Sequence, residues 1–394
     1  MSRTHYWLLV AALALTGLSM RTAVTSVGAA LDELQDGLHA SGTVAGAITT
    51  LPVICFAGLG VVTPLLARAV GSHRLLVFAL AISTLGLALR PIGSSVAWFM
   101  VGSVLALAGG AASNVLLPSL VKTHFPERVG AMTALYTTAL AVGTTAAAGL
   151  TVPFGDAAGS WRVGLASWAV PCALAVLPWL PTLHGDHARI GTNAESTPLL
   201  ALVRSRTAWA LAIFFATQSM QAYIQFGWFA RFLSGHGLSH GEAGAMVALL
   251  TAVGIPVSLV APRVPPHRHR ALLMAFGACS AAAYAGLAAA PVGGAWLWMV
   301  LAGIGGGMFP VALVLIAYRS RTPATTAALS AFVQVIGYLV AGCGPLLFGA
   351  LFGATNSWAL PLTVLFIALA ISVAAAWPST AGRYVDAELA ASAP

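Results

Sequence analysis

The chain has 394 residues, of which 59% are hydrophobic and only 7% are charged. Soluble domains carry about 25% charged residues, so this composition excludes an ordinary soluble protein and indicates an integral membrane protein. The net charge of +8 comes mostly from arginines in short segments between apolar runs. That distribution is typical of membrane topology signals and does not indicate binding to nucleic acid.

The first apolar run, residues 7–31, contains a single arginine, Arg21, near its centre. A helix rises about 1.5 Å per residue, so Arg21 lies roughly 21 Å beyond Trp7, near the middle of a hydrocarbon core about 30 Å thick. A central arginine costs about 2.5–3.5 kcal/mol to insert and normally faces a water-filled cavity or a partner inside the bundle. The run therefore predicts an uncleaved first transmembrane helix beside a polar cavity.

Apolar segments of similar length continue along the chain and predict an all-α membrane protein with 12 transmembrane helices. They cover residues 7–31, 43–66, 74–92, 96–121, 130–153, 161–181, 207–230, 242–262, 271–290, 295–317, 324–352 and 357–377. The longest polar stretch divides them six and six. We therefore expect an N-terminal half (1–181), a cytoplasmic linker (182–206) and a C-terminal half with a short tail (207–394).

The basic residues predict the orientation. With the N-terminus inside, the inner loops and tails hold 14 of the 18 Lys and Arg residues, while Arg90, Arg162 and Arg231 fall at outer ends. The positive-inside rule then places both termini in the cytoplasm. The halves also resemble each other, since LAGGAASNVLLPSL (107–120) is similar to LAGIGGGMFPVALV (301–314). Such repeats are typical of alternating-access transporters, and chance similarity between apolar segments is the alternative.

The junction after the second span, PLLARAVGSHR, resembles the Gly-x-Leu-Ala-Asp-Arg-x-Gly-Arg-Arg loop motif of the major facilitator superfamily. Ala67 stands where that motif has aspartate, which argues against a charge-relay latch at this loop. The resemblance implies two six-helix halves with inverted repeats, a monomer, and gating roles for the loop residues. Those residues are Arg68, Gly71 and Arg74, with Arg263 at the corresponding position of the second half.

Within that superfamily the chain is similar to the cyanate permease and 2-nitroimidazole transporter branch (CynX/NimT). The motifs that carry the similarity are MRTAVTSVGAAL (20–31), NVLLPSLVKTHFPERVGAMTALYTTALAVG (114–143), QSMQAYIQFGWF (218–229), LSHGEAGAMVAL (238–249) and QVIGYLVAGCGPLLFG (334–349). The branch usually has Asn-Leu-Arg-Pro-Ala at the first motif, where this chain has Ser19, Met20 and Thr22 around Arg21. The resemblance implies transport of small solutes, often anions, across a bacterial-type cytoplasmic membrane.

Polar side chains near the middle depth of several spans are candidates for a shared solute site with Arg21. Spacings of three or four residues place such side chains on one helical face. Under a two-half repeat, span one corresponds to span seven and span five to span eleven. The candidates are Arg21, Thr25, Asn114, Tyr136, Gln218, Gln221, Tyr223, Gln334 and Tyr338. Alternatively, Arg21 bonds backbone carbonyls beside a helix break, or Asp32 or Glu33 near the outer end. Gln218 and Gln334 would then join helices to one another.

The guanidinium of Arg21 offers a fork of donors that suits a planar oxyanion, and the amides and phenols add donors, acceptors and flat walls. No Asp, Glu or His falls in the middle of a predicted span, so coupling to protons would have to use Asp32, Glu33 or Glu242 near the outer surface. The sequence has no catalytic set, metal-ligand pair or phosphate-binding loop, so we expect neither an enzyme nor a cofactor.

The sequence therefore predicts a secondary active or facilitative transporter that moves a small anionic or polar planar solute by alternating access. One alternative is a proton-driven exporter of larger drug-like compounds. Another is a membrane sensor or enzyme that binds without translocating.

Overall fold

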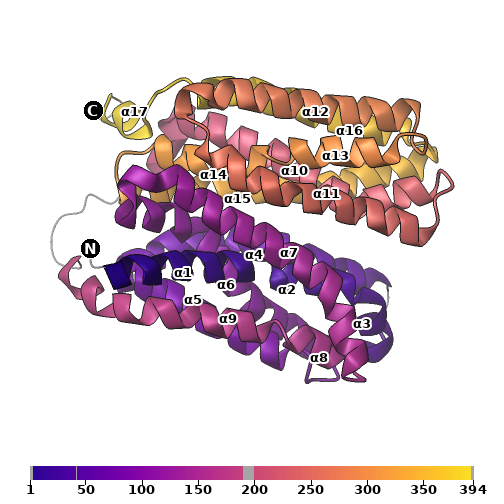
Figure 1. The fold of residues 1–394 in the computed structure, drawn as a ribbon, viewed down its shortest axis with the longest axis horizontal. Coiled ribbons are helices and arrows are strands. Elements are labelled where there is room, and N and C mark those ends of the chain that lie inside the picture. The colour runs from indigo at the N-terminus through magenta and orange to yellow at the C-terminus, as the bar shows by residue number, and fades with distance from the viewer. Residues whose placement is uncertain (1–2, 41, 190–198, 392–394) are drawn as a thin grey trace. The chain divides into compact units, whose positions relative to one another are not determined.

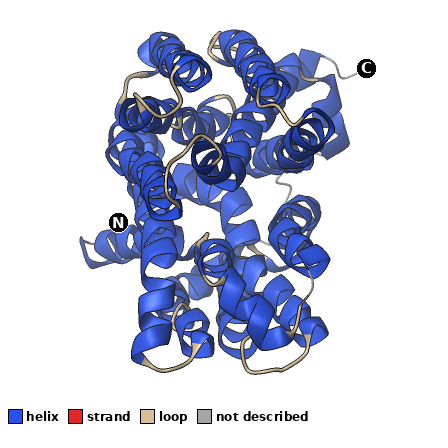
Figure 2. Cartoon of the chain, turned by 90° about the vertical axis from the view of Figure 1, so that its right-hand side faces the viewer, coloured by secondary structure: helices blue, strands red, loops and turns tan. Residues whose placement is uncertain are grey.

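The computed structural model describes residues 3–40, 42–189 and 199–391, and every regular element in these ranges is helical (Figures 1 and 2). The all-α prediction is therefore confirmed. The chain divides into two units, and Val129–Ala134 groups with the second. Unit 1 comprises Met1–Arg128 and Leu135–Ser196, and unit 2 comprises Val129–Ala134 and Thr197–Pro394. Residues 190–198 of the predicted linker lie outside the described residues.

Unit 1 holds the helices of the first six predicted spans, except for Val129–Ala134 at the start of α7. They are α1 (Arg3–Ser19), α2 (Thr22–Ala29), α3 (Leu31–Leu38), α4 (Gly42–Val70), α5 (Ser72–Leu89), α6 (Val96–His124), α7 (Val129–Ala157), α8 (Trp161–Ala166) and α9 (Ala169–Val176). Helix α6 packs against α4 and α5, and α5 and α1 both pack against α9. The run Gly109-Gly110-Ala111-Ala112-Ser113 of α6 is entirely buried, because small residues let neighbouring backbones approach closely.

Unit 2 holds the remaining six spans and a short C-terminal helix (Figure 1). Its helices are α10 (Arg206–Ser234), α11 (His240–Val260), α12 (His269–Ala289), α13 (Ala295–Gly305), α14 (Met308–Tyr318), α15 (Pro323–Thr355), α16 (Ala359–Ser379) and α17 (Val385–Ala391). Helix α10 packs against α15 and α16, while α13 packs against α11 and α12.

Among the described residues, 11 helical segments are long and apolar enough to cross a membrane. Helix α10 supplies the remaining predicted span: its 29 residues extend about 43 Å, and glutamines lower its mean hydropathy. Three predicted spans (7–31, 161–181 and 295–317) are interrupted rather than continuous. The break between α13 and α14 falls at Gly306 and Gly307, where low helix propensity favours an interruption. Short helices α3 and α17 were not predicted.

The C-terminal helix α17 places two carboxylates at the N-terminal ends of the two longest helices of unit 2. Glu388 accepts hydrogen bonds from the hydroxyls of Ser205 and Thr207 (both 2.7 Å) and from the Thr207 N–H (3.1 Å), at the start of α10. Asp386 accepts from the Arg321 N–H (2.6 Å) and the Thr325 hydroxyl (2.8 Å), at the start of α15. Negative charge is favourable there, because the helix dipole is positive at its N-terminus.

Replacing Glu388 with glutamine is expected to lower the free energy of unfolding by about 1 kcal/mol at pH 7, because the amide accepts fewer of these hydrogen bonds. Burial raises the pKa of Glu388, but the hydrogen bonds from Ser205 and Thr207 outweigh burial and leave that pKa below its ordinary value. A lowered pKa stabilises the folded protein above about pH 4.3, the unfolded value, and this contribution is lost as the pH falls further.

The measurement is thermal unfolding of the purified protein in detergent at pH 7 and near pH 4. The exposed Glu127→Gln variant is the matched control, since it removes the same charge without breaking a cap. Equal stability of Glu388→Gln and the unaltered protein at pH 7 would contradict the capping role of α17.

Candidate solute-binding site

The first span breaks at its arginine. Helix α1 ends at Ser19 and α2 begins at Thr22, and Arg21 lies between them at φ −121° and ψ 0°. The Thr22 hydroxyl donates to the Ser19 carbonyl (3.1 Å), and the Arg21 carbonyl accepts from the Val24 and Thr25 N–H groups (both 3.0 Å). Since hydrocarbon offers no hydrogen bonds, these local partners are what allow non-helical backbone at this depth.

Helices α6 and α7 both pack closely against the backbone just before the break. A side chain at Gly110 of α6 would begin 2.3 Å from the Met20 carbonyl oxygen, and one at Gly143 of α7 would begin 1.9 Å from the Leu18 carbonyl oxygen. Neither distance leaves room for a carbon atom. Helices α6 and α7 therefore touch the backbone on the N-terminal side of Arg21 directly, which fixes where α1 ends.

The other candidates of unit 1 lie around the same break. Asn114 is 3% exposed and follows Gly110 by four residues, so it lies on the face of α6 that meets the break. Tyr136 is 1% exposed, and its backbone lies against Gly17 of α1. The Thr25 hydroxyl donates to the Arg21 carbonyl (3.1 Å), which assigns it first to the local structure of the break.

Arg90 supports the second half of span one from a buried position that the sequence does not indicate. It follows the last residue of α5, at a span end as the sequence predicts, and only 1% of its surface is exposed. Its guanidinium donates to the Ala23 carbonyl and the Ser26 hydroxyl of α2 (both 2.9 Å) and lies over the Phe99 ring at 5.7 Å. Arg90 thus ties the second half of span one to α5. No sequence signal distinguished it from an exposed arginine at a span end.

In unit 2, Gln218, Tyr223 and Tyr338 lie where α10 meets α15, near Phe215, which was not among the predicted site residues. The Tyr338 ring meets the edge of the Phe215 ring (centroids 5.4 Å apart) and lies near Tyr223 (6.5 Å). The Gln218 amide donates to the Phe215 carbonyl (3.2 Å) and the neighbouring Ser219 hydroxyl (2.6 Å). The Gln334 amide donates to the Ser330 hydroxyl (2.8 Å) on α15.

Gln221, although spaced like Gln218, belongs to a different set of contacts. Its amide oxygen accepts from the Tyr284 hydroxyl (2.9 Å), and its nitrogen donates to the Thr217 carbonyl (3.1 Å) and the Ser372 hydroxyl (3.2 Å). Gln225 donates to the same Tyr284 hydroxyl (2.8 Å). These bonds join α10, α12 and α16, so both glutamines serve the packing of unit 2.

The predicted gating residues lie at helix ends. Arg68 is exposed in the last turn of α4, and Arg74 is half-buried in the first turn of α5. Gly71, between these helices, has a φ of +93°, a value that side-chain-bearing residues rarely adopt. Arg263 is exposed and donates to the Leu259 carbonyl (3.0 Å), which caps the end of α11.

Two of the acidic residues considered for proton coupling, Glu33 and Glu242, are exposed. Glu33 is exposed on α3, and the side chain of Asp32 lies outside the described part of the chain. Glu242 is exposed and accepts from the Ser239 N–H (2.9 Å) and hydroxyl (2.7 Å), while Ser239 accepts from the Glu242 N–H (3.3 Å). This reciprocal pair is a capping box that starts α11, and it accounts for both residues.

The structure has long helices in two units, with polar side chains buried inside the spans. The span that contains Arg21, the residue most costly to place in hydrocarbon, is interrupted. These features are typical of a secondary transporter. The sequence profile of the Major Facilitator Superfamily matches residues 9–345, and the chain belongs to this family. It is a multi-pass membrane transporter of small solutes, in the branch with cyanate and 2-nitroimidazole transporters.

Relatives in that branch cover nearly the whole chain. A 2-nitroimidazole transporter of Escherichia coli (strain K12) is 30% identical over 361 residues, 90% of each chain. The cyanate transport protein CynX of the same strain is 28% identical over 341 residues, covering 86% of this chain and 88% of its own. An uncharacterized transporter of Bacillus subtilis (strain 168), YycB, is 34% identical over 389 residues, 96% of this chain and 95% of its own.

The fold is similar to that of solved transporters. The structure of the proton:xylose symporter XylE bound to 6-bromo-6-deoxy-D-glucose matches with a TM-score of 0.76 at 15% identity, covering 99% of each chain. At that identity the likeness shows the fold alone.

The contact of α7 with α1 predicts different effects of one substitution at two positions. Gly143→Ala is expected to lower the free energy of unfolding by about 1–3 kcal/mol, because the new methyl group overlaps the Leu18 carbonyl. Gly149→Ala, on the same helix, meets nothing within 4 Å and is expected to be neutral or stabilising by up to about 1 kcal/mol. Thermal unfolding in detergent measures both. Equal midpoints would contradict the close approach.

A substitution at Tyr284 distinguishes helix packing from solute contact in unit 2. Tyr284→Phe removes the hydroxyl shared by Gln221 and Gln225 and is expected to destabilise the protein by about 1 kcal/mol. Solute affinity should be unchanged, because the Tyr284 hydroxyl is already bonded to Gln221 and Gln225 within the network that joins α10, α12 and α16. Unfolding midpoints and solute titrations test the two halves of this expectation. A stable variant with weakened solute affinity would show that the network contacts the solute.

Proposed function

We propose that this transporter carries a small, planar solute that is anionic or strongly dipolar, and that Arg21 is its anchor. The observation that carries this proposal is the break of span one at Arg21. Helix α2 starts there, so the partial positive charge of its N-terminus adds to the full charge of the guanidinium. Two sources of positive charge at one point inside an apolar span favour a negatively charged group.

The names of the relatives support the same class of solute. Cyanate is a small linear anion, and 2-nitroimidazole is a flat ring with a strongly dipolar nitro group. Both have oxygen atoms that accept hydrogen bonds from the in-plane N–H groups of a guanidinium. A fork of N–H donors recognises such groups better than the point charge of a lysine would.

We assign Asn114 and Tyr136 as further solute contacts in unit 1, and Gln218, Gln334 and Tyr338 in unit 2. These side chains are 1–5% exposed and carry hydrogen-bond donors and acceptors. We leave Gln221 and Glu242 out, since the interhelical network and the capping box account for them. Thr25 supports the break.

The proposed location is a bacterial-type cytoplasmic membrane, with both termini in the cytoplasm. In this proposal the protein is a monomer and transports its solute by alternating access. The positive-inside distribution of the basic residues supports this orientation. Arg68, Gly71, Arg74 and Arg263 lie at ends of helices next to short loops, where a change between two states of the transporter would alter their contacts. Nucleic acid and cofactors have no part in this function.

Arg21→Gln is expected to abolish uptake in proteoliposomes and to weaken solute binding by about 10- to 150-fold, the value of a hydrogen-bonded charge. The panel holds cyanate, nitrate, short carboxylates and 2-nitroimidazole. A ligand at 100 times its Kd stabilises the folded protein by about 2.7 kcal/mol, so thermal shifts identify the solute class before transport is measured.

Arg3→Gln is the matched control, since it removes one positive charge from the same span at its exposed end. Normal transport by folded Arg21→Gln would overturn the anchor role. Thermal shifts only with bulky apolar compounds, together with transport that depends on a pH gradient, would instead support the exporter alternative.

A further inference from the structure

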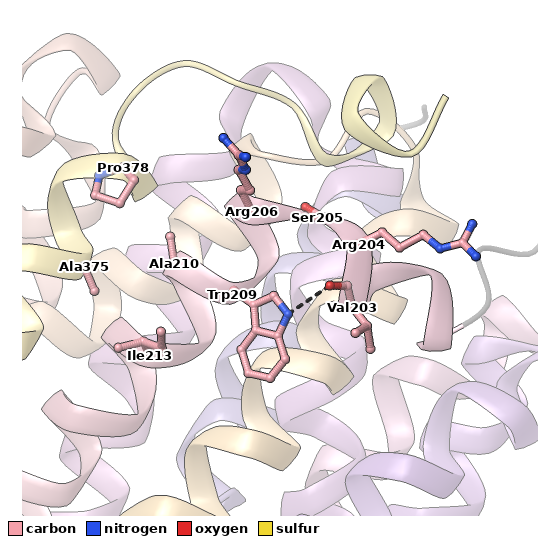
Figure 3. A pocket seen from close by; sticks show the side chains of 9 residues that line it. All are labelled: Val203, Arg204, Ser205, Arg206, Trp209, Ala210, Ile213, Ala375 and Pro378. Atoms are coloured by element: carbon pink, nitrogen blue, oxygen red, sulfur yellow. Dashed lines mark hydrogen bonds between the residues drawn. The ribbon is translucent and has the colours of Figure 1, made fainter. Parts of the chain in front are cut away.

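A groove in unit 2 is unconnected with any residue discussed for solute transport. It lies between the start of α10 and the end of α16 and has a volume of about 390 Å³ (Figure 3). At roughly 30 Å³ per water molecule, that volume holds about thirteen waters, which is far more than a single ion needs. The lining residues are Val203, Arg204, Ser205, Arg206, Trp209, Ala210, Ile213, Ala375 and Pro378.

The groove is apolar inside and basic at its rim. Ala210, Ile213 and Ala375 form its apolar part, and Ile213 is 40% exposed. The Trp209 indole donates to the Val203 carbonyl (3.0 Å), which holds the ring against the groove (Figure 3). An apolar lining of this kind favours a hydrocarbon chain over a soluble metabolite.

Arg204 and Arg206 are both exposed at the rim, and neither forms an ion pair within the part of the chain that the structure describes. The nearest carboxylate along the lining is that of Glu388, which contacts Ser205. Its oxygens already accept three hydrogen bonds from Ser205 and Thr207. The net charge at the rim is therefore positive and available to an anion.

Exposed indoles place the groove at the level of lipid headgroups. Trp209 is 39% exposed, and Trp377, which precedes Pro378 of the lining, is 57% exposed. Tryptophan collects at the boundary between hydrocarbon and water. The Arg270 guanidinium lies over the Trp377 ring at 4.0 Å, which adds a third cation at this level.

We propose that this groove binds one anionic phospholipid from the adjoining leaflet. The negatively charged phosphate of the headgroup would contact Arg204 and Arg206, and an acyl chain would follow Ile213, Ala210 and Ala375. Each arginine near a membrane surface raises the affinity for an anionic lipid about fivefold, so two arginines give a preference of about 25-fold over a zwitterionic lipid. The bound lipid would hold the start of α10, the helix that Glu388 also caps.

The test is native mass spectrometry of the full chain, delipidated in detergent and then titrated with phosphatidylglycerol or phosphatidylcholine of the same acyl chains. We expect one phosphatidylglycerol to be retained at concentrations about 25-fold lower than phosphatidylcholine. In the variant Arg204→Gln/Arg206→Gln this preference should fall to within about threefold. Ile213→Trp, which keeps both charges and crowds the apolar part, should weaken retention of both lipids.

The control variant Arg3→Gln/Arg268→Gln removes two exposed arginines elsewhere and should keep the preference. Equal retention of the two lipids by the unaltered protein, or an equal loss of preference in the control, would overturn the proposal. Competition by soluble glycerol phosphate at similar concentrations would do so as well, because it would show a headgroup site without an acyl chain. None of these outcomes depends on which solute the protein transports.

Discussion

The constraint on which this structure depends is that every polar backbone group inside hydrocarbon needs a partner. Span one departs from the helix at Arg21, and the departure is possible because the Ser19 and Arg21 carbonyls find donors within a few residues. Glycines of α6 and α7 then press against the backbone on one side of the break. The second half of the span is held by Arg90, which donates to Ala23 and Ser26. The interruption of span one at Arg21 is thus supported by contacts from α6, α7 and Arg90.

Buried polar groups in unit 2 have two uses that sequence spacing does not separate. Gln218, Gln221 and Gln225 follow the spacing of one helical face. Yet Gln221 and Gln225 bond Tyr284 across the bundle, and Gln218 bonds within its own helix beside Phe215. The difference follows from which neighbour each face of α10 meets, α15 or α12 and α16. Hydrogen bonds between membrane helices are individually modest, so such a network fixes the register of helices as much as their stability.

The ends of the spans carry the charges that the interior excludes. Glu388 and Asp386 stabilise the N-termini of α10 and α15, Glu242 starts α11, and Arg263 caps its end. Arg204, Arg206 and Trp209, beside the start of α10, line a basic, partly apolar groove. Charged residues at the span ends therefore cap helices at some positions and line this groove at others.

The sequence by itself determined the class of protein, because span length and hydropathy follow directly from the thickness of a bilayer. It also determined the family, the positions of all twelve long segments within a few residues, and Arg21 as the residue that needs an explanation. Only the tertiary structure decided that span one is broken, that Arg90 is buried, and that Gln221 packs helices while Glu242 caps one. Periodicity tells which residues share a face, but the helix that covers that face is set by packing between segments far apart in the chain.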